Sequence, residues 1–194
     1  MIAVIGGTGT TGKYVVTELQ KRDADFRCIV RDEAKARATM GDGVRLVTGD
    51  ISDAASIEEG CAGCDALFLL SPHNPALGQQ QSDAIDAAKR AGVTRIVKLA
   101  GMMTNPEMRI PAQHGIAERY LQASGTAWTI VRPNFFMQNL LNAAPAVKGQ
   151  GKIVMPFPAD RPIGMIDVRD SAEVCALALL EDGHSEQIYE LTGA

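Results

Sequence analysis

Glycines near the N-terminus have a spacing that could place a phosphate group against the backbone. Gly7, Gly9 and Gly12 satisfy the pattern G-x-G-x-x-G in "VIGGTGTTGKYVV", and Gly6 begins an overlapping G-x-x-G-x-x-G. They follow an apolar run and open an amphipathic one, so a helix N-terminus with free N–H groups would face a bound pyrophosphate. The alternative is a tight turn that binds nothing. The residues expected to contact a dinucleotide phosphate are Gly6, Thr8, Gly9, Thr10, Thr11 and Gly12.

The choice between the two nicotinamide dinucleotides depends on residues about 20 positions farther along. Asp32 lies where an acid would bond a ribose 2′-OH, which is typical of NAD sites. Arg31 directly precedes it, and a guanidinium suits a 2′-phosphate by its charge and its fork of donors. The sequence favours NADP, with NAD as the alternative. A solvated strand end is the other interpretation of Arg31.

Neither the cysteines nor the histidines have the spacing of metal ligands. Cys61 and Cys64 form a C-x-x-C that precedes a predicted strand, whereas a thioredoxin-like pair follows a strand and opens a helix. No second pair or nearby histidine completes a zinc site. We therefore expect no metal and interpret the pair as part of a loop before a buried strand.

Short apolar runs alternate with helical patterns as far as Pro133. Such continuous apolar runs are typical of parallel strands covered on both faces by helices. The pattern predicts an α/β fold with a doubly wound, Rossmann-like parallel sheet of about six strands. The predicted strands are 2–7, 26–31, 44–50, 65–71, 94–101 and 127–133, and the predicted helices are 10–21, 33–40, 53–60, 79–91 and 112–124.

The pattern loosens after the sixth predicted strand. Residues 134–151 predict a helix broken by Pro145, and three prolines within 155–164 exclude regular structure there. We expect one NAD(P)-binding domain over 1–194, in which 134–169 contribute part of a small, irregular C-terminal substrate lobe.

Regular structure is expected to resume near the C-terminus. A helix over 167–182 should begin with Asp170 or Ser171 as its N-cap, and 187–193 predict a last short strand.

The composition limits the classes of partner. The 194 residues are 46% hydrophobic and 22% charged, as in soluble globular domains, and the net charge of −4 disfavours nucleic acid. No run approaches the ~18 apolar residues of a membrane span, and no basic leader precedes the first apolar run. We expect a cytoplasmic protein with a small-molecule partner and no membrane partner; a homo-oligomer is compatible with the sequence.

Seven segments carry a family resemblance over nearly the whole chain: "VIGGTGTTGKYVVTEL", "CIVRD", "VTGDISD", "GCDALFLLSP", "GVTRIVKLAG", "TIVRPNFFMQNL" and "IDVRDSAEVCALAL". Together they resemble the NmrA-like branch of the atypical short-chain dehydrogenases. Within that branch the chain is most similar to NAD(P)H-dependent quinone reductases and triphenylmethane reductases.

The resemblance implies further site residues, all at predicted carboxyl ends of strands, where open α/β sheets bind ligands. Asp50 and Ile51 would flank the adenine. The segment Leu70, Ser71 and Pro72 would lie along the cofactor. Pro133, Asn134 and Phe135 would approach the nicotinamide end, the last two as substrate contacts. His73 follows the fourth strand and is a candidate for the mouth of the substrate site, or else an ordinary loop histidine.

The usual proton donor of short-chain dehydrogenases is missing. None of the tyrosines, at 14, 120 and 189, has a lysine four residues later, and the helix that should carry the tyrosine has His114 and Glu118 instead. His114 is therefore the candidate catalytic residue, as a proton donor or an orienting group. The alternative is a histidine that only packs or caps at a helix start.

Two functions follow from this absence. The first is an NAD(P)H-dependent oxidoreductase that transfers hydride to a quinone-like or related small acceptor, which tolerates slow protonation. The second is an NmrA-type redox sensor that binds the dinucleotide without turnover. The resemblance also implies some tens of residues beyond "YELTGA", so we expect the substrate lobe to be truncated in this sequence.

Overall fold

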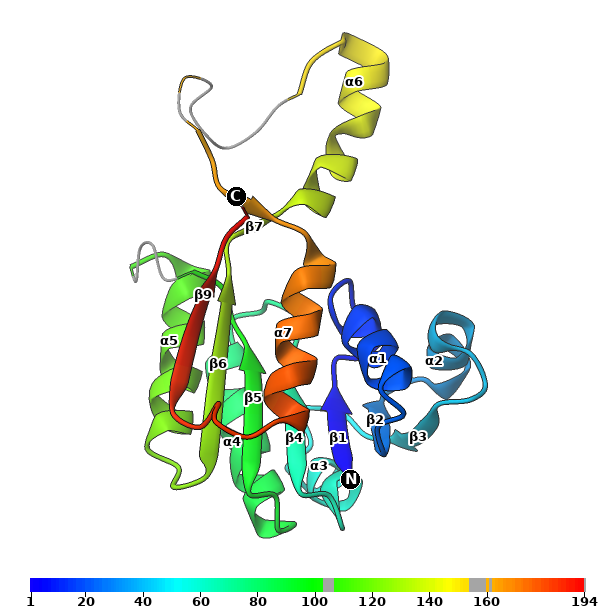
Figure 1. The fold of residues 1–194 in the computed structure, drawn as a ribbon, viewed down its shortest axis with the longest axis vertical. Coiled ribbons are helices and arrows are strands. Elements are labelled where there is room, and N and C mark those ends of the chain that lie inside the picture. The colour runs from blue at the N-terminus through cyan, green and yellow to red at the C-terminus, as the bar shows by residue number, and fades with distance from the viewer. Residues whose placement is uncertain (103–106, 154–159, 161, 194) are drawn as a thin grey trace.

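The computed structural model describes residues 1–102, 107–153, 160 and 162–193. Its main strands are β1 (Ile2–Ile5), β2 (Phe26–Val30), β3 (Arg45–Thr48), β4 (Ala66–Leu69), β5 (Arg95–Leu99), β6 (Ala127–Pro133) and β9 (Gln187–Leu191). They form one sheet in the order β3-β2-β1-β4-β5-β6-β9, and every neighbouring pair is parallel (Figure 1). The predicted doubly wound fold is confirmed, with a seventh strand added at one edge.

Helices cover both faces of this sheet, because its inner strands, such as β1 and β4, are apolar on both sides. They are α1 (Gly12–Lys21), α2 (Glu33–Met40), α3 (Ala54–Cys61), α4 (Leu77–Arg90), α5 (Arg109–Gln122) and α7 (Val168–Leu180). Helices α1 and α7 pack side by side on one face, and α3, α4 and α5 cover the other (Figure 1).

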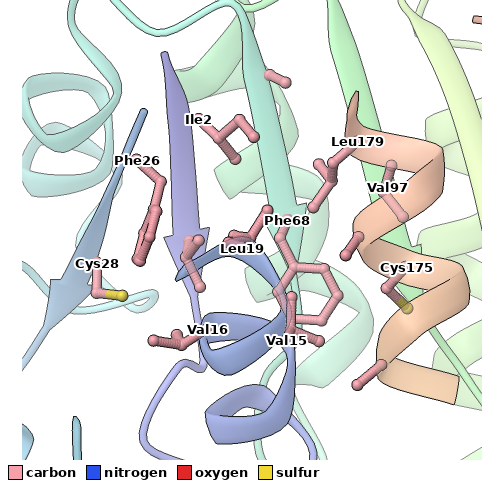
Figure 2. Close-up of a cluster of buried hydrophobic side chains, with 14 of the residues drawn as sticks. Ile2, Val15, Val16, Leu19, Phe26, Cys28, Phe68, Val97, Cys175 and Leu179 are labelled. Atoms are coloured by element: carbon pink, nitrogen blue, oxygen red, sulfur yellow. The ribbon is translucent and has the colours of Figure 1, made fainter. Parts of the chain in front are cut away.

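Each face has its own apolar core. Figure 2 shows the first, where Val15 and Leu19 of α1 meet Phe68 of β4 and Cys175 of α7. The second joins α3, α4 and α5 to the sheet through side chains such as Ile85. Burying one such side chain fully contributes about 1.5–3 kcal/mol. The two cores hold the strand ends in fixed positions, which is what the site requires.

The segment after β6 differs from the predicted broken helix. It begins with a short strand, β7 (Phe135–Phe136), continues as a 3-10 helix, η1 (Met137–Ala143), and ends in α6 (Ala144–Gln150). Pro145 lies in the first turn of α6, where its missing N–H leaves no hydrogen bond unmade, so it starts a helix rather than breaking one. Strand β7 pairs in parallel with β8 (Met165–Ile166), and α6 stands away from the sheet (Figure 1).

The predicted N-cap of α7 is wrong by three or four positions. The cap is Asp167, whose carboxylate accepts the backbone N–H of Arg169 at 2.8 Å. Asp167 has extended backbone angles, as an N-cap requires, while Asp170 lies in the first turn and Ser171 is buried within the helix. The predicted last strand is confirmed as β9, which pairs with β6 along five residues.

Candidate functional site

A cleft of about 850 Å³ opens at the carboxyl ends of the strands. It lies over β1 and β4, which are neighbours in the middle of the sheet. The chain leaves β1 toward β2 and leaves β4 toward β5, on the opposite side. Such a reversal of strand order leaves a crevice between the connecting loops, and open α/β sheets bind their ligands there.

The glycine turn after β1 forms one wall of the cleft, and two of its glycines are required by neighbouring backbone. Gly6 has a φ of +84°, and a Cβ there would lie 2.4 Å from the carbonyl oxygen of Leu70. A Cβ on Gly12, the first residue of α1, would lie 2.0 Å from the carbonyl oxygen of Gly6. These two glycines let the turn close against β4 and let α1 begin directly behind it.

Gly9 has a different environment. A Cβ on Gly9 would meet only the Gly6 oxygen, at 3.3 Å, within 4 Å among the described residues, and Gly9 lines the cleft. No side chain caps the first turn of α1, whose N-cap is Thr11, and no acidic residue lies in that turn. An open glycine beside an uncapped helix N-terminus fits a pyrophosphate, because free N–H groups and the helix dipole both favour an anion.

Nearly all of the predicted site residues meet at this cleft. Only Gly12 does not line it, because it packs behind the turn. Those that do are Gly6, Thr8, Gly9, Thr10, Thr11, Arg31, Asp50, Ile51, Leu70, Ser71, Pro72, His73, His114, Pro133, Asn134 and Phe135. Their roles in binding and chemistry remain predictions.

Arg31 and Asp50 lie at the adenosine end implied by the resemblance. Ser52 donates to the Asp50 carboxylate from its backbone N–H at 2.8 Å and from its hydroxyl at 2.7 Å, and these bonds lower the pKa of Asp50. The Arg31 guanidinium lies 3.9 Å from that carboxylate and its side chain is 72% exposed. Asp32, the residue that would favour NAD, instead caps α2 by accepting the Lys35 N–H at 3.0 Å.

At the other end of the cleft, a line of side-chain nitrogen atoms leads from the cleft into the core. Nε2 of His114 lies 3.3 Å from Nε2 of His73, and both residues line the cleft. On its inner side, Nδ1 of His114 lies 3.1 Å from Nζ of Lys98, a fully buried residue of β5. Burial is the main cause that lowers the pKa of His114, to about 3, and the Lys98 charge adds to it. His114 is therefore neutral at physiological pH.

A buried ion pair lies behind this line of nitrogen atoms. Glu118, one turn after His114 on α5, accepts from Arg132 of β6 at 2.6 Å, and the Glu118 side chain is only 4% exposed. The pair holds α5 against the sheet and so keeps His114 over the cleft. The absence of the usual tyrosine is thus accompanied by a different set of titratable groups.

Two residues near the cleft were not among the predicted site residues. Lys98 stands in the apolar run "RIVKLAG", and a lysine there is the one signal that could have indicated a buried amine. Gln81 of α4 is fully buried and donates from Nε2 to the Ser71 hydroxyl at 2.8 Å, which orients that hydroxyl at the cleft wall. Gln81 lies four residues before Ile85, on the buried face of α4, so its position in the helical pattern could have indicated burial although its residue type did not.

The residues that the structure describes hold no group of three or more His, Cys, Asp or Glu side chains that could bind a metal ion. Among them, no helix combines the length and the apolar character that crossing a bilayer requires. Cys61 and Cys64 are buried and free, and burial raises the pKa of Cys61 to about 12.

The glycine turn and the cleft agree with what is found in known proteins. A family model described as NAD(P)H-binding matches residues 6–182. The chain is 39% identical over 195 residues to the NAD(P)H azoreductase of Xenophilus azovorans, covering all of this chain and 68% of that enzyme. The chain belongs to the NAD(P)H-binding, NmrA-like family.

Crystal structures of relatives of this NmrA-like protein are known. Quinone oxidoreductase 2 of Escherichia coli is 32% identical over 200 residues, and the chain covers 68% of its length. A crystal structure of the E. coli NADPH-dependent quinone oxidoreductase QOR2 complexed with NADPH superimposes on this chain with a TM-score of 0.90. The two are 31% identical, and the superposition covers 100% of this chain and 69% of that one. Citrobacter triphenylmethane reductase shares the fold, with a TM-score of 0.87. It is 22% identical, and the superposition covers 99% of this chain and 70% of that one.

Proposed function

We propose that this NmrA-like protein is an NADPH-dependent reductase that transfers hydride to a quinone-like acceptor. The observation that carries the proposal is a single cleft with two unlike ends. One end has the open glycine and the uncapped helix N-terminus. The other has two histidines beside an apolar wall that includes Phe135. A dinucleotide stretched between these ends would bring its nicotinamide toward the histidines.

The preference for NADPH rests on the two neighbours Arg31 and Asp32. Arg31 lines the cleft with an exposed guanidinium, which can form charge-assisted hydrogen bonds with a 2′-phosphate. Asp32 is occupied as the N-cap of α2 and does not line the cleft, so it is poorly placed to bond a ribose 2′-OH. The family binds NAD(P)H, and these two side chains favour the phosphorylated form.

The preference for a quinone-like acceptor rests on the available acid. A bound reduced nicotinamide supplies the hydride. A ketone that accepts hydride becomes a strongly basic alkoxide, which must be neutralised as it forms. A quinone yields a far less basic hydroquinone anion, which can take its proton from water or from an imidazole that regains a proton as it gives one. Relatives named for azo and quinone reduction point to the same class of electron-poor acceptor.

Stopped-flow oxidation of bound NADPH tests the proposal. The protein is mixed with NADPH and then with a quinone, an azo dye, a cationic triphenylmethane dye or a simple ketone. We expect rapid oxidation by one or more of the first three and almost none by the ketone. Robust ketone reduction would contradict the argument about the acid. Tight NADPH binding with no oxidation by any acceptor would favour the redox sensor instead.

A further inference from the structure

Lys98 is a buried lysine for which hydride transfer by itself gives no role. It lies in the middle of the sheet, is fully buried and does not line the cleft. Burying an ammonium group costs several kcal/mol unless partners compensate for it. A stable fold could have used an apolar residue at this position, so the position needs an explanation.

The neighbours of Lys98 connect it to the cleft. Its Nζ faces Nδ1 of His114 at 3.1 Å, and Nε2 of His114 faces Nε2 of His73 at 3.3 Å. His73 follows β4 on a loop that lines the cleft, and it is exposed to solvent. Three residues from three elements thus form an unbroken line of nitrogen atoms from the core to solvent.

We propose that Lys98 is the internal proton store of the reductase, and that His114 and His73 pass its proton to the reduced acceptor. The inference rests on the proposed function, which requires one proton for each hydride transferred. His73 would be the catalytic residue that touches the acceptor. Lys98 and His114 would supply it from behind.

The contacts define which nitrogen of each ring carries hydrogen. The Lys98 ammonium can only donate, so Nδ1 of His114 accepts from it and Nε2 of the neutral His114 ring carries the hydrogen. That N–H points at Nε2 of His73, which accepts, so the neutral His73 ring carries its hydrogen on Nδ1. Every donor in the line therefore points toward the cleft.

The proton transfer balances without a further reactant. The acceptor oxygen takes the Nδ1 proton of His73, whose Nε2 receives the Nε2 proton of His114. Nδ1 of His114 then receives a proton from the Lys98 ammonium, which becomes a neutral amine. Both rings remain neutral and change tautomer. After product release, a solvent proton on Nδ1 of His73 drives the same steps in reverse and restores the ammonium.

The surroundings of Lys98 suit a store that both gives and regains a proton near neutrality. The charged and titratable groups that face it are His114 and Glu118 on α5, Arg132 on β6, and His73 on the loop after β4. Burial is the main cause that lowers the pKa of Lys98 to about 7. The Arg132 charge lowers it further, and Glu118 opposes both.

Kinetics with a quinone test the proposal through substitutions of Lys98. For the parent we expect kcat to fall as the pH rises above about 7, because the ammonium is lost. Lys98→Met should lower kcat at pH 7 roughly a hundredfold, the lower end of the effect of a general acid. It should also remove this pH dependence and leave the Kd for NADPH within about twofold. Lys98→Arg keeps the charge but cannot release a proton, so it should fail to restore kcat.

An exposed lysine gives the matched control. Lys21→Met removes a lysine whose side chain is 63% exposed, and it should leave the parent's pH profile unchanged. A parent profile retained by Lys98→Met would overturn the proton store while leaving the proposed reductase intact. Full rescue by Lys98→Arg would show that only the charge matters, and it would also overturn the store.

A second measurement does not depend on turnover. The chain has only three histidines, so their ring nitrogens can be assigned in ¹⁵N-labelled protein by single substitutions. We expect the hydrogen of His114 on Nε2 and that of His73 on Nδ1 below pH 7, where Lys98 keeps its proton. A His114 ring with its hydrogen on Nδ1 would break the line and overturn the inference, whether or not an acceptor for NADPH is found.

Discussion

Replacing Gly9 by alanine should separate the binding role of the glycine turn from its role in folding. The added Cβ would lie 3.3 Å from the Gly6 oxygen and would meet nothing else within 4 Å among the described residues. A shift of a few tenths of an ångström accommodates it. Alanine also lowers the entropy of the unfolded chain, which contributes about 0.4–1 kcal/mol in the opposite direction. We expect the free energy of unfolding to change by less than about 1 kcal/mol.

The same methyl group should oppose binding, because it would occupy the face of the turn on which we place the pyrophosphate. Overpacking a close contact typically costs about 1–3 kcal/mol. The Kd for NADPH should therefore rise by about fivefold to somewhat more than a hundredfold, since every 1.4 kcal/mol is a factor of ten. Quenching of intrinsic fluorescence or calorimetric titration would measure it, beside urea unfolding of the same sample.

Gly12→Ala is the matched control. Its Cβ would lie 2.0 Å from the Gly6 oxygen and 2.7 Å from the Gly6 carbonyl carbon, so the backbone itself must move. We expect it to lose several kcal/mol of stability as well as NADPH affinity, the result of an altered fold. If Gly9→Ala folds normally and still binds NADPH as tightly as the parent, the pyrophosphate does not lie on this turn.

Three further substitutions test other parts of the site. Arg31→Ala should weaken the binding of NADPH about tenfold or more and that of NADH little, because a hydrogen bond to a charged group contributes about 1.5–3 kcal/mol. Arg45→Ala is the control, and an equal loss of affinity for both dinucleotides would rule out a contact between Arg31 and the 2′-phosphate. Below pH 6.5 the unfolded chain protonates His114, while the folded chain does so only near pH 3, so the free energy of unfolding should decrease as the pH is lowered through that window, by up to about 1.4 kcal/mol per pH unit. Urea unfolding at pH 7 and 4.5 should show a smaller decrease for His114→Gln than for the parent, and an equal decrease would show that His114 titrates normally. Glu118→Gln should cost less than the about 3–5 kcal/mol of a buried charge left without any partner, because Arg132 keeps its ion pair with the exposed Glu190; the double variant Glu118→Leu with Arg132→Met should cost less still, and a costlier double variant would contradict this account of the pair.

Much of the fold could be predicted because its central strands are buried on both faces. Strands β1 and β4 are buried at every residue, so they appear in the sequence as continuous apolar runs with no polar interruption. The start of α7 was predicted less well. Several residues that can cap a helix occur near that point, and only the backbone conformation at Asp167 selects one of them. The structure of the segment after β6 was also hard to predict, because β7 pairs with β8, which lies some 30 residues later in the chain.

The cleft could be predicted as far as it depends on topology. Parallel strands bring their carboxyl ends to one edge, so Arg31, Asp50 and Leu70 were expected to gather there before any side chain was placed. The line from His73 to Lys98 could not be predicted in the same way. It depends on how α5 packs against α4 and β6, which sets the side of His114 that faces the core. A single lysine in an apolar run indicates that something unusual is buried, but not its partner.

The edge position of β9 has a consequence for how the chain is synthesised. Strand β6 has seven residues, four of which, Trp128 to Val131, have high β-propensity, and β9, which pairs with it, lies more than 50 residues later in the chain. As the protein leaves the ribosome, the inner strands can assemble while β6 still presents an unpaired row of N–H and C=O groups. Exposed edges of this kind recruit other strands and promote aggregation. Chaperone binding to nascent chains should therefore decrease once residues 187–191 have emerged.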